Sequence, residues 1–241
     1  MNDLAFSSFT LNGVDAQKFL QGQVTLHVER LAENSTRYTS ICNLKGRILF
    51  GLWLTKINAE SFEIVAVADQ AEGLAKHIKK FGAFSKMKLE EAATVYPTAN
   101  GIQTTFSTEV TDVNVWVLNA IESGQSFIQA ASTELFQPQE LRLHQRDGIH
   151  YDKGCYLGQE VIARLWFKAK PKAWLHLISG TTATPSIGEQ LHNNVQVVNS
   201  ITVDGGYKAL VVAKPDALEE IGVIVLTLPE ELSGDVARPQ A

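Results

Sequence analysis

The residue types that could do chemistry are concentrated in one segment, DKGCYLGQEVIAR, from Asp152 to Arg164. Alternate side chains of an extended stretch share a face, so Lys153 and Cys155 should point the same way. An ammonium group close to a thiol favours the thiolate, which is the nucleophilic and metal-binding form of cysteine. The sequence after Gly158 favours a helix, whose positive amino-terminal end would favour the thiolate further. We therefore predict a reactive thiol at Cys155, with burial as a small hydrophobic side chain as the alternative.

The remaining residues of this segment carry weaker predictions. Gly154 has no side chain, so a ligand or another part of the backbone could approach it closely. Glu160 and Arg164 are four residues apart on the expected helix, which favours a surface ion pair, while Glu160 in the first turn would also complement the helix dipole. The other cysteine, Cys42, has no comparable neighbourhood and is expected in the core.

Other catalytic and metal-binding patterns are absent from the sequence. The six histidines form no pair four residues apart and lie at no metal-ligand spacing from cysteines or carboxylates, so we expect no stably bound metal. Without a Cys-x-x-Cys pair, the chain alone cannot supply the cysteines of a standard iron–sulfur cluster. Phosphate-binding glycine loops and the Gly-x-Ser-x-Gly motif are also missing, which disfavours a nucleotide-driven or serine-triad enzyme.

Composition indicates an ordinary globular protein. The chain has 241 residues, 45% of them hydrophobic and 20% charged, with a net charge of −5. This charge argues against strong, general nucleic-acid binding, although a local basic groove remains compatible with it. We expect no secretory signal and no membrane span, because the longest apolar run, Ile48–Leu54, is far too short for one. Two distant cysteines form no disulfide framework, so a reducing, cytoplasmic location is expected.

The first ninety residues alternate between strand and helix patterns. Short-range periodicity predicts a helix in VDAQKFLQGQ, with Val14, Phe19 and Leu20 on its apolar side, and a longer helix capped by Asp69 in DQAEGLAKHIKKFGAF. Apolar runs predict strands in GRILFGLWLTK, SFEIVAVAD and KMKLEE. This order predicts an α+β fold with a largely antiparallel sheet.

The middle of the chain is less regular. Ala92–Val113 lacks periodicity and is expected to connect two elements, with one short strand at GIQTTFS. The apolar run in VNVWVLNAIESG fits a helix or a strand. PQELRLHQRDG predicts a helix, with Pro138 in its first turn and Gly148 just after its end.

Short strand patterns separated by Gly, Pro and Asn turns follow after about residue 170. They are typical of a small antiparallel barrel or sandwich. We place a domain boundary near Phe167–Lys172. This divides the chain into residues 1–168, an α+β region, and residues 169–241, a C-terminal β-barrel domain.

The segment KGCYLGQE matches the Lys-Gly-Cys-Tyr-x-Gly-Gln-Glu signature of the YgfZ-type proteins, and the chain resembles this family over nearly its whole length. The YgfZ-type proteins are the folate-binding branch of the glycine-cleavage T-protein (aminomethyltransferase) superfamily. Further similarity lies in LNGVDAQKFLQGQVT, CNLKGRILF, KKFGAFSKMKL, IESG and FQPQE.

The resemblance implies a T-protein-like fold around a central hole that can hold tetrahydrofolate or a derivative. It also implies an accessory role in assembling or maintaining iron–sulfur clusters, including those of enzymes that thiomethylate tRNA. The expected partners are therefore iron–sulfur enzymes or assembly factors, and folate, with no membrane. Cys155 is the residue on which family function depends, and Lys153 its electrostatic partner. Folate-side residues are expected at Phe6, Trp116, Gly154, Tyr156, Gly158, Gln159 and Glu160; for Trp116 a place in the core is an equal alternative.

Two departures from the family pattern bear on the activity. Phe50 and Gly51 stand where the T-protein enzymes carry a pair of aspartates, so an acid or base for folate nitrogen chemistry is missing there. The middle region is also short, which would open the folate cavity or weaken binding. We therefore favour an accessory protein without catalytic turnover. The alternatives are a tetrahydrofolate-dependent aminomethyl or one-carbon transferase and a folate-independent interaction scaffold.

Overall fold

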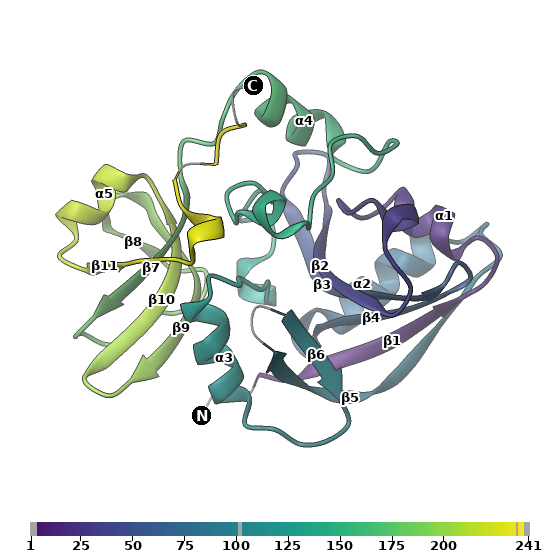
Figure 1. Ribbon diagram of the computed structural model, residues 1–241, viewed down its shortest axis with the longest axis horizontal. Helices are drawn as coiled ribbons and strands as arrows, with labels where there is room; N and C mark the ends of the chain where they lie inside the picture. Colours follow the sequence, from purple (N-terminus) through teal and green to yellow (C-terminus); the bar gives the residue numbers. More distant parts are fainter. Residues whose placement is uncertain (1–3, 101–102, 235, 239–241) are drawn as a thin grey trace.

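The first half of the chain folds into a six-stranded antiparallel sheet (Figure 1). The computed structural model describes residues 4–100, 103–234 and 236–238. The strands lie in the order β2-β3-β4-β1-β5-β6. Their bounds are β1 (Phe6–Asn12), β2 (Ser35–Cys42), β3 (Ile48–Asn58), β4 (Ser61–Val67), β5 (Lys88–Asn100) and β6 (Gln103–Ser107). The apolar runs predicted as strands form β3 and β4, and the KMKLEE strand begins β5.

Two helices cover one face of this sheet. Helix α1 (Ala16–Gln21) is followed by Gly22, and its Phe19 and Leu20 are buried as predicted. The placement of Val14 on its apolar side is wrong, because Val14 precedes the helix and is 61% exposed. Helix α2 (Ala68–Phe81) begins after Val67, so the prediction that Asp69 caps it is wrong. The carboxylate of Asp69 instead accepts a hydrogen bond from the backbone N–H of Ala130, which ties the helix to a distant loop.

The middle region is more regular than its sequence indicated. Strand β5 runs on to Asn100 and pairs with β6, so most of the expected connecting segment is an antiparallel hairpin. The consecutive residues Thr94, Val95 and Tyr96 have side chains that favour this extended conformation. Helix α3 (Val113–Glu122) follows and resolves the helix-or-strand alternative; the side chain of Asp112 caps it by accepting from the backbone N–H of Asn114.

The α-helix predicted between Pro138 and Gly148 does not form. This stretch contains turns and one short 3-10 helix, η3 (Leu143–Arg146), bounded on both sides by left-handed residues, Arg142 and Asp147, each with φ of 59°. The buried Arg142 guanidinium donates to the backbone carbonyls of Leu175 and Gly234. Tertiary hydrogen bonds therefore replace the regular helical pattern that the sequence favoured.

The last third of the chain forms a second, curled antiparallel sheet with strand order β11-β7-β10-β9-β8. Helix α4 (Gln159–Phe167) precedes it, as the sequence predicted. The strands are β7 (Trp174–Gly180), β8 (Gln190–Leu191), β9 (Val195–Val203), β10 (Gly206–Ala213) and β11 (Ile224–Leu226). The remaining helical elements are α5 (Pro215–Glu220), η1 (Val28–Arg30), η2 (Ala130–Ser132), η4 (His192–Asn194) and η5 (Glu230–Leu232).

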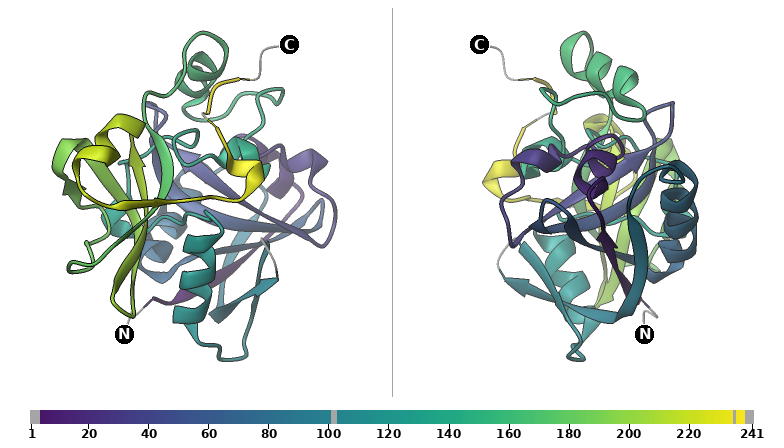
Figure 2. Two further views of the ribbon diagram at one scale, coloured as in Figure 1. Left: turned by 60° about the vertical axis from the view of Figure 1, so that its left-hand side comes forward. Right: turned by 90° about the vertical axis from the view of Figure 1, so that its right-hand side faces the viewer.

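The two sheets share a hydrophobic core. One cluster joins Phe6 and Trp53 of the first sheet to α3 and to Leu177 and Leu210 of the second, and a separate cluster lies under α1 and α2. Figure 2 shows α3 beside both sheets. Among the described residues, no helix has the length and apolar character needed to span a membrane.

Candidate functional site: a central cavity and an exposed cysteine loop

A cavity of about 280 Å³ lies between the first sheet and the irregular segments that follow α3. Its wall contains aromatic side chains from the sheet, Tyr38 of β2 and Trp53 of β3. Residues 124–126, the η3 turn and Glu231 near the C-terminus also line it. Parts of the chain that are distant in sequence therefore meet around one partly open cavity.

Three buried polar groups on the residues of this wall have no hydrogen-bond partner within the described chain. They are the indole Nε1 of Trp53, the hydroxyl of Ser126 and the Nε of Arg146. The Trp and Arg nitrogens can only donate, and the Ser hydroxyl can donate or accept. Since buried polar groups in proteins are nearly always paired, these atoms indicate a site for a ligand rich in hydrogen-bond acceptors.

Positive charge is present at the same wall. Arg146 also donates to the carbonyl of Ser123, and burial lowers the pKa of its guanidinium, although Glu231 opposes this effect. Arg37 donates from Nε to the Asp147 carboxylate at 3.4 Å. The cavity therefore combines aromatic surface with two guanidinium groups, a combination suited to a planar ligand that carries a carboxylate.

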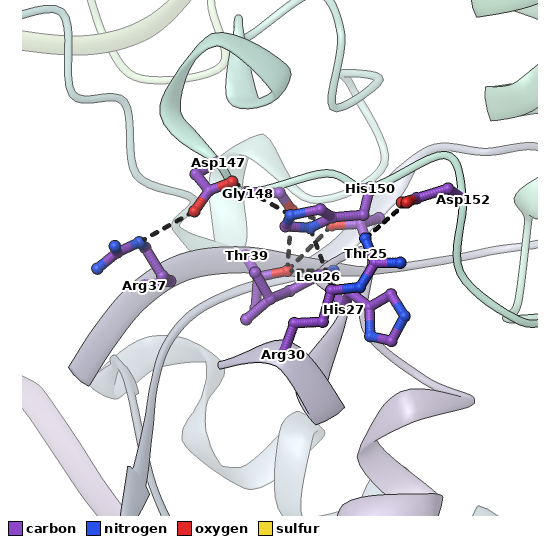
Figure 3. Close-up of polar contacts among 10 residues, drawn as sticks. All are labelled: Thr25, Leu26, His27, Arg30, Arg37, Thr39, Asp147, Gly148, His150 and Asp152. Carbon is purple, nitrogen blue, oxygen red and sulfur yellow. Dashed lines mark hydrogen bonds and ion pairs between the residues drawn. The ribbon is translucent and has the colours of Figure 1, made fainter. Parts of the chain in front are cut away.

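Asp147 begins a segment that leads from the cavity to the cysteine motif (Figure 3). Its carboxylate lies 3.2 Å from Nε2 of His150, whose Nδ1 accepts from the backbone N–H of His27. The carbonyl of Gly148 accepts from the hydroxyls of Thr25 and Thr39. These contacts attach residues 147–150 to the first sheet and to the segment between α1 and η1.

Lys153 does not face Cys155. Its side chain is buried, and its ammonium donates to the backbone carbonyls of Gln21, Val24 and Leu26 at 2.7, 2.5 and 2.8 Å. The expectation that Lys153 and Cys155 share a face is therefore wrong, because three carbonyls at the end of α1 and in the segment after it bind the ammonium inside the protein. Burial lowers the pKa of Lys153 to about 7, and Glu29 opposes this shift.

Cys155 is exposed, so the alternative of a buried hydrophobic cysteine applies to Cys42 and not to Cys155. The neighbouring Tyr156 is buried, with its ring 4.6 Å from the Lys153 ammonium. Burial raises the pKa of the Tyr156 hydroxyl. In the motif, two buried residues, Lys153 and Tyr156, therefore flank two exposed ones, Gly154 and Cys155.

The backbone conformation and close packing at Gly158 explain why this motif position is a glycine. Gly158 has φ of +82° and caps α4, and a Cβ there would lie 2.4 Å from the carbonyl oxygen of Asn43. A Cβ at Gly154 would meet nothing within 4 Å. Gln159 is half-buried and Glu160 is exposed, both in the first turn of α4. None of these residues lines the cavity, so their predicted contact with folate has no support from this geometry.

Trp116 and Phe6 lie in the core beside the cavity. Their rings meet edge to face at 5.2 Å, and both contact the ring of Trp53. The indole N–H of Trp116 donates to the hydroxyl of Thr104, which lies on the cavity wall. Trp116 therefore packs behind Thr104 and Trp53, which line the cavity.

Phe50 and Gly51 offer no room for the missing carboxylate pair. A Cβ at Gly51 would lie 2.0 Å from the Tyr38 hydroxyl oxygen. Phe50 packs towards α2, with its ring 5.6 Å from that of His77. The carboxylates that line this cavity are instead those of Asp147 and Glu231.

Sequence reasoning missed the residues that line the cavity: Arg37, Trp53, Ser126, Arg146 and Asp147. The family similarity at IESG, residues 121–124, lies just before Ser126 in the sequence but did not identify Ser126 as a site residue. Nothing in the local sequence distinguishes these side chains from ordinary surface or core residues, because their common cavity arises only when β2, β3 and the η3 turn meet.

No family model matches the chain. Among curated proteins, it is 27% identical over 236 aligned residues to the tRNA-modifying protein YgfZ of Shigella sonnei, covering 76% of this chain and 72% of the relative. The YgfZ protein of Escherichia coli matches with the same identity and coverage. An uncharacterised protein of Haemophilus influenzae is 25% identical over 228 residues, covering 81% of both chains.

Among solved structures, the fold matches the glycine cleavage system aminomethyltransferase T of Bartonella henselae with a TM-score of 0.65. The two sequences are 12% identical, and the match covers 87% of this chain and 76% of that one. At this identity the likeness concerns the fold. The sequence relatives and the fold together support the resemblance drawn from the KGCYLGQE motif: the chain is similar to the YgfZ proteins and has the glycine-cleavage T-protein fold.

Proposed function

We propose that the chain is a folate-associated accessory protein for iron–sulfur enzymes, including those that thiomethylate tRNA. In this role it binds tetrahydrofolate or a derivative in the central cavity and presents Cys155 to a partner in the cytoplasm. The observation that carries the proposal is the separation of an exposed motif cysteine from a cavity with unpartnered polar groups. The name of the YgfZ relatives, tRNA-modifying protein, supports the same direction.

The cavity residues fit the chemistry of a folate. Tetrahydrofolate joins a hydrogen-bonding reduced pterin, whose pyrimidine half is planar, to a glutamate with two carboxylates. Tyr38 and Trp53 offer aromatic surface to the ring, and Ser126 offers a free hydroxyl. Arg37 and Arg146 supply charge-assisted donors for carboxylates. When bound, the folate supplies a carrier for one-carbon units, and the chain's own residues bind and orient it.

A binding titration tests this assignment. Tetrahydrofolate is added to the purified protein while tryptophan fluorescence is followed, because Trp53 lies on the cavity wall. We expect saturable quenching that is largely lost in Trp53→Phe and weakened about tenfold in Arg146→Gln, since a charge-assisted hydrogen bond contributes roughly 1.5–3 kcal/mol. Trp174→Phe, which changes a tryptophan outside the cavity, is the matched control. Absence of binding by the folded wild type would favour the folate-independent scaffold.

Cys155 is proposed to contact a cluster, a persulfide or a thiol of the partner transiently. A single exposed cysteine cannot hold a cluster alone, so the partner must bring the other ligands. We expect Cys155→Ala to reduce tRNA thiomethylation in cells severely while leaving the unfolding midpoint unchanged. Cys42→Ala, in the core, should instead lower stability. Full activity of the Cys155→Ala variant would exclude this role.

One observation keeps a one-carbon transferase as the second candidate. Asp147 brings a carboxylate to the cavity, held by Arg37 and His150. A correctly placed carboxylate can act as a general base. Turnover of an aminomethyl or methyl donor with tetrahydrofolate, lost in Asp147→Asn, would establish this activity. We expect no turnover, because the position of the T-protein aspartates is occupied by Phe50 and Gly51.

A further inference from the structure

Helix α4 follows the cysteine motif and lies at the outer edge of the molecule, away from both sheets (Figures 1 and 2). Of its nine residues, only Ile162 is buried. Phe167 at its end is 52% exposed, and Leu44, in the turn that packs beside Gly158, is 78% exposed. A helix this apolar normally buries a wider face, so part of its apolar surface is available to a partner.

The same region carries an excess of positive charge in an otherwise acidic chain. Residues 158–172 contain four cationic side chains and one anionic one, Glu160, whereas the whole chain has a net charge of −5. The cationic residues are exposed, and Lys45 lies in the turn next to α4. The α4 surface, as we call it, consists of Lys45, Arg164, Lys168, Lys170, Lys172, Leu44 and Phe167.

The aromatic residues behind this surface fix its shape. The rings of Tyr151 and Trp166 stack at 4.3 Å, nearly parallel, and the His144 ring meets that of Trp166 edge to face at 5.2 Å. Tyr151 belongs to the segment that enters the motif, and Trp166 belongs to α4. The stack therefore holds α4 at a fixed distance from the loop that carries Cys155.

We propose that the α4 surface docks an acidic patch on a protein partner and brings that partner's thiol or cluster to Cys155. The proposal rests on the proposed role of Cys155. Charge complementarity identifies the partner's chemistry, because cationic side chains surround exposed apolar ones. A protein interface combines an apolar centre with a polar rim in this way. An extended phosphate backbone would require a longer basic track than one helix and a turn, and the net charge of the chain would repel it.

Disulfide exchange with defined peptides tests the proposal. The probe is a short peptide with glutamates on both sides of one cysteine, activated as the mixed disulfide with thionitrobenzoate. The Cys155 thiolate attacks the peptide sulfur, forms a new peptide–Cys155 disulfide and releases thionitrobenzoate, whose absorbance gives the rate. A peptide with glutamines in place of the glutamates is the neutral comparison. We expect the acidic peptide to react about tenfold faster at low salt, as electrostatic steering allows.

Three variants locate the effect. Lys168→Glu combined with Lys172→Glu should remove the advantage of the acidic peptide, and Cys155→Ala should abolish the reaction. Lys79→Glu combined with Lys86→Glu makes the same change in net charge at exposed lysines of α2 and the turn after it. This matched pair should keep most of the advantage. Raising the salt to about 0.5 M should also suppress the advantage in the wild type, because the Debye length then falls well below 10 Å.

Equal rates for the two peptides in the wild type would overturn the proposal, as would an advantage that the matched pair removes equally. An oligoribonucleotide at equal concentration should not compete; if it abolishes the acidic peptide's advantage, the surface belongs to RNA and the proposal fails. These outcomes are separable from the cellular test of Cys155. Normal tRNA thiomethylation with Cys155→Ala removes the proposed function, whereas the peptide rates decide the docking surface by themselves.

Discussion

The central cavity and the cysteine loop differ in how their buried polar groups are partnered. In the cavity wall, Trp53, Ser126 and Arg146 each have a buried polar atom without a partner in the described chain. In the loop, the buried ammonium of Lys153 has three carbonyl partners. The unpaired groups of the cavity wall support the proposed ligand site, whereas the buried ammonium of the loop is already paired within the chain.

The sequence analysis expected residues of the cysteine motif to contact folate as well. The structure instead separates the cysteine loop from the cavity that we propose for the ligand. The residues 147–152 join them, with Asp147 at the cavity and Asp152 paired with Arg30 next to the motif (Figure 3). Substitutions in the loop should therefore act mainly on folding, and substitutions in the cavity mainly on ligand binding. The following experiments test that distinction, from the largest expected effect to the smallest.

Lys153→Met should be the most destabilising change. It leaves the carbonyls of Gln21, Val24 and Leu26 buried without a donor, and each unsatisfied group costs about 1–3 kcal/mol. We expect a loss of about 4 kcal/mol in the free energy of unfolding, measured by urea denaturation. Lys45→Met, at an exposed lysine, should change it by less than about 0.5 kcal/mol. A loss below about 1 kcal/mol for Lys153→Met would show that the loop does not depend on this anchor.

Gly158→Ala should follow, because it combines a left-handed φ of +82° with a close approach of Cβ to the Asn43 carbonyl oxygen. We expect a loss of about 3 kcal/mol, of which the left-handed conformation accounts for roughly 1–2 kcal/mol. The matched change Gly154→Ala meets open space and should leave thermal unfolding nearly unchanged. If both substitutions cost the same, the distinction between anchored and exposed motif residues is wrong.

Acid should lower the free energy of unfolding through His144, which lies between the cavity and α4. His144 lies in η3, which borders the cavity, and packs on Trp166 of α4. Burial, with a smaller effect of Arg142, lowers the pKa of His144 to about 4 in the folded state, against 6.5 in the unfolded chain. Between these values the unfolded state binds more protons, so stability falls as the pH drops from 6.5 to 4.

We expect this histidine to account for about 2 kcal/mol of the loss over that range. His144→Gln should flatten the dependence of the urea midpoint on pH, whereas His192→Gln, at a site outside the core, should leave it unchanged. An unaltered pH profile in His144→Gln would contradict this assignment.

Ser126→Ala should have the smallest effect on stability. The Ser126 hydroxyl is buried without a partner, so its removal leaves nothing else unsatisfied, and the free energy of unfolding should stay within about 0.5 kcal/mol of the wild type or rise. Its affinity for tetrahydrofolate should fall several-fold in the same fluorescence titration. A clear loss of stability would place this hydroxyl in the folding of the chain and not in ligand binding.

The elements that the sequence predicted correctly are those whose pattern is local. The apolar runs in β3 and β4 bury both faces, and the periodicity before Gly22 forms α1. Where tertiary contacts compete, the predictions were wrong. Asp69 bonds to Ala130 instead of capping α2, and the buried Arg142 takes a left-handed conformation where a helix was expected. The weak pattern of β5 and β6 hid a hairpin that pairing with β1 stabilises.

The candidate site shows the same division between features that follow from local sequence and features that depend on tertiary contacts. The amino-acid sequence alone indicated the resemblance to the YgfZ proteins, through the KGCYLGQE motif, and the core position of Cys42. The prediction of a thiol function for Cys155 also comes from the sequence and stays a prediction. Only the tertiary structure decided that Lys153 turns inward to three carbonyls and that Trp53, Ser126 and Arg146 meet at one cavity. The physical reason is that a motif fixes residue types over a few positions. The direction of a buried charge and the convergence of distant side chains depend instead on which segments the fold brings together.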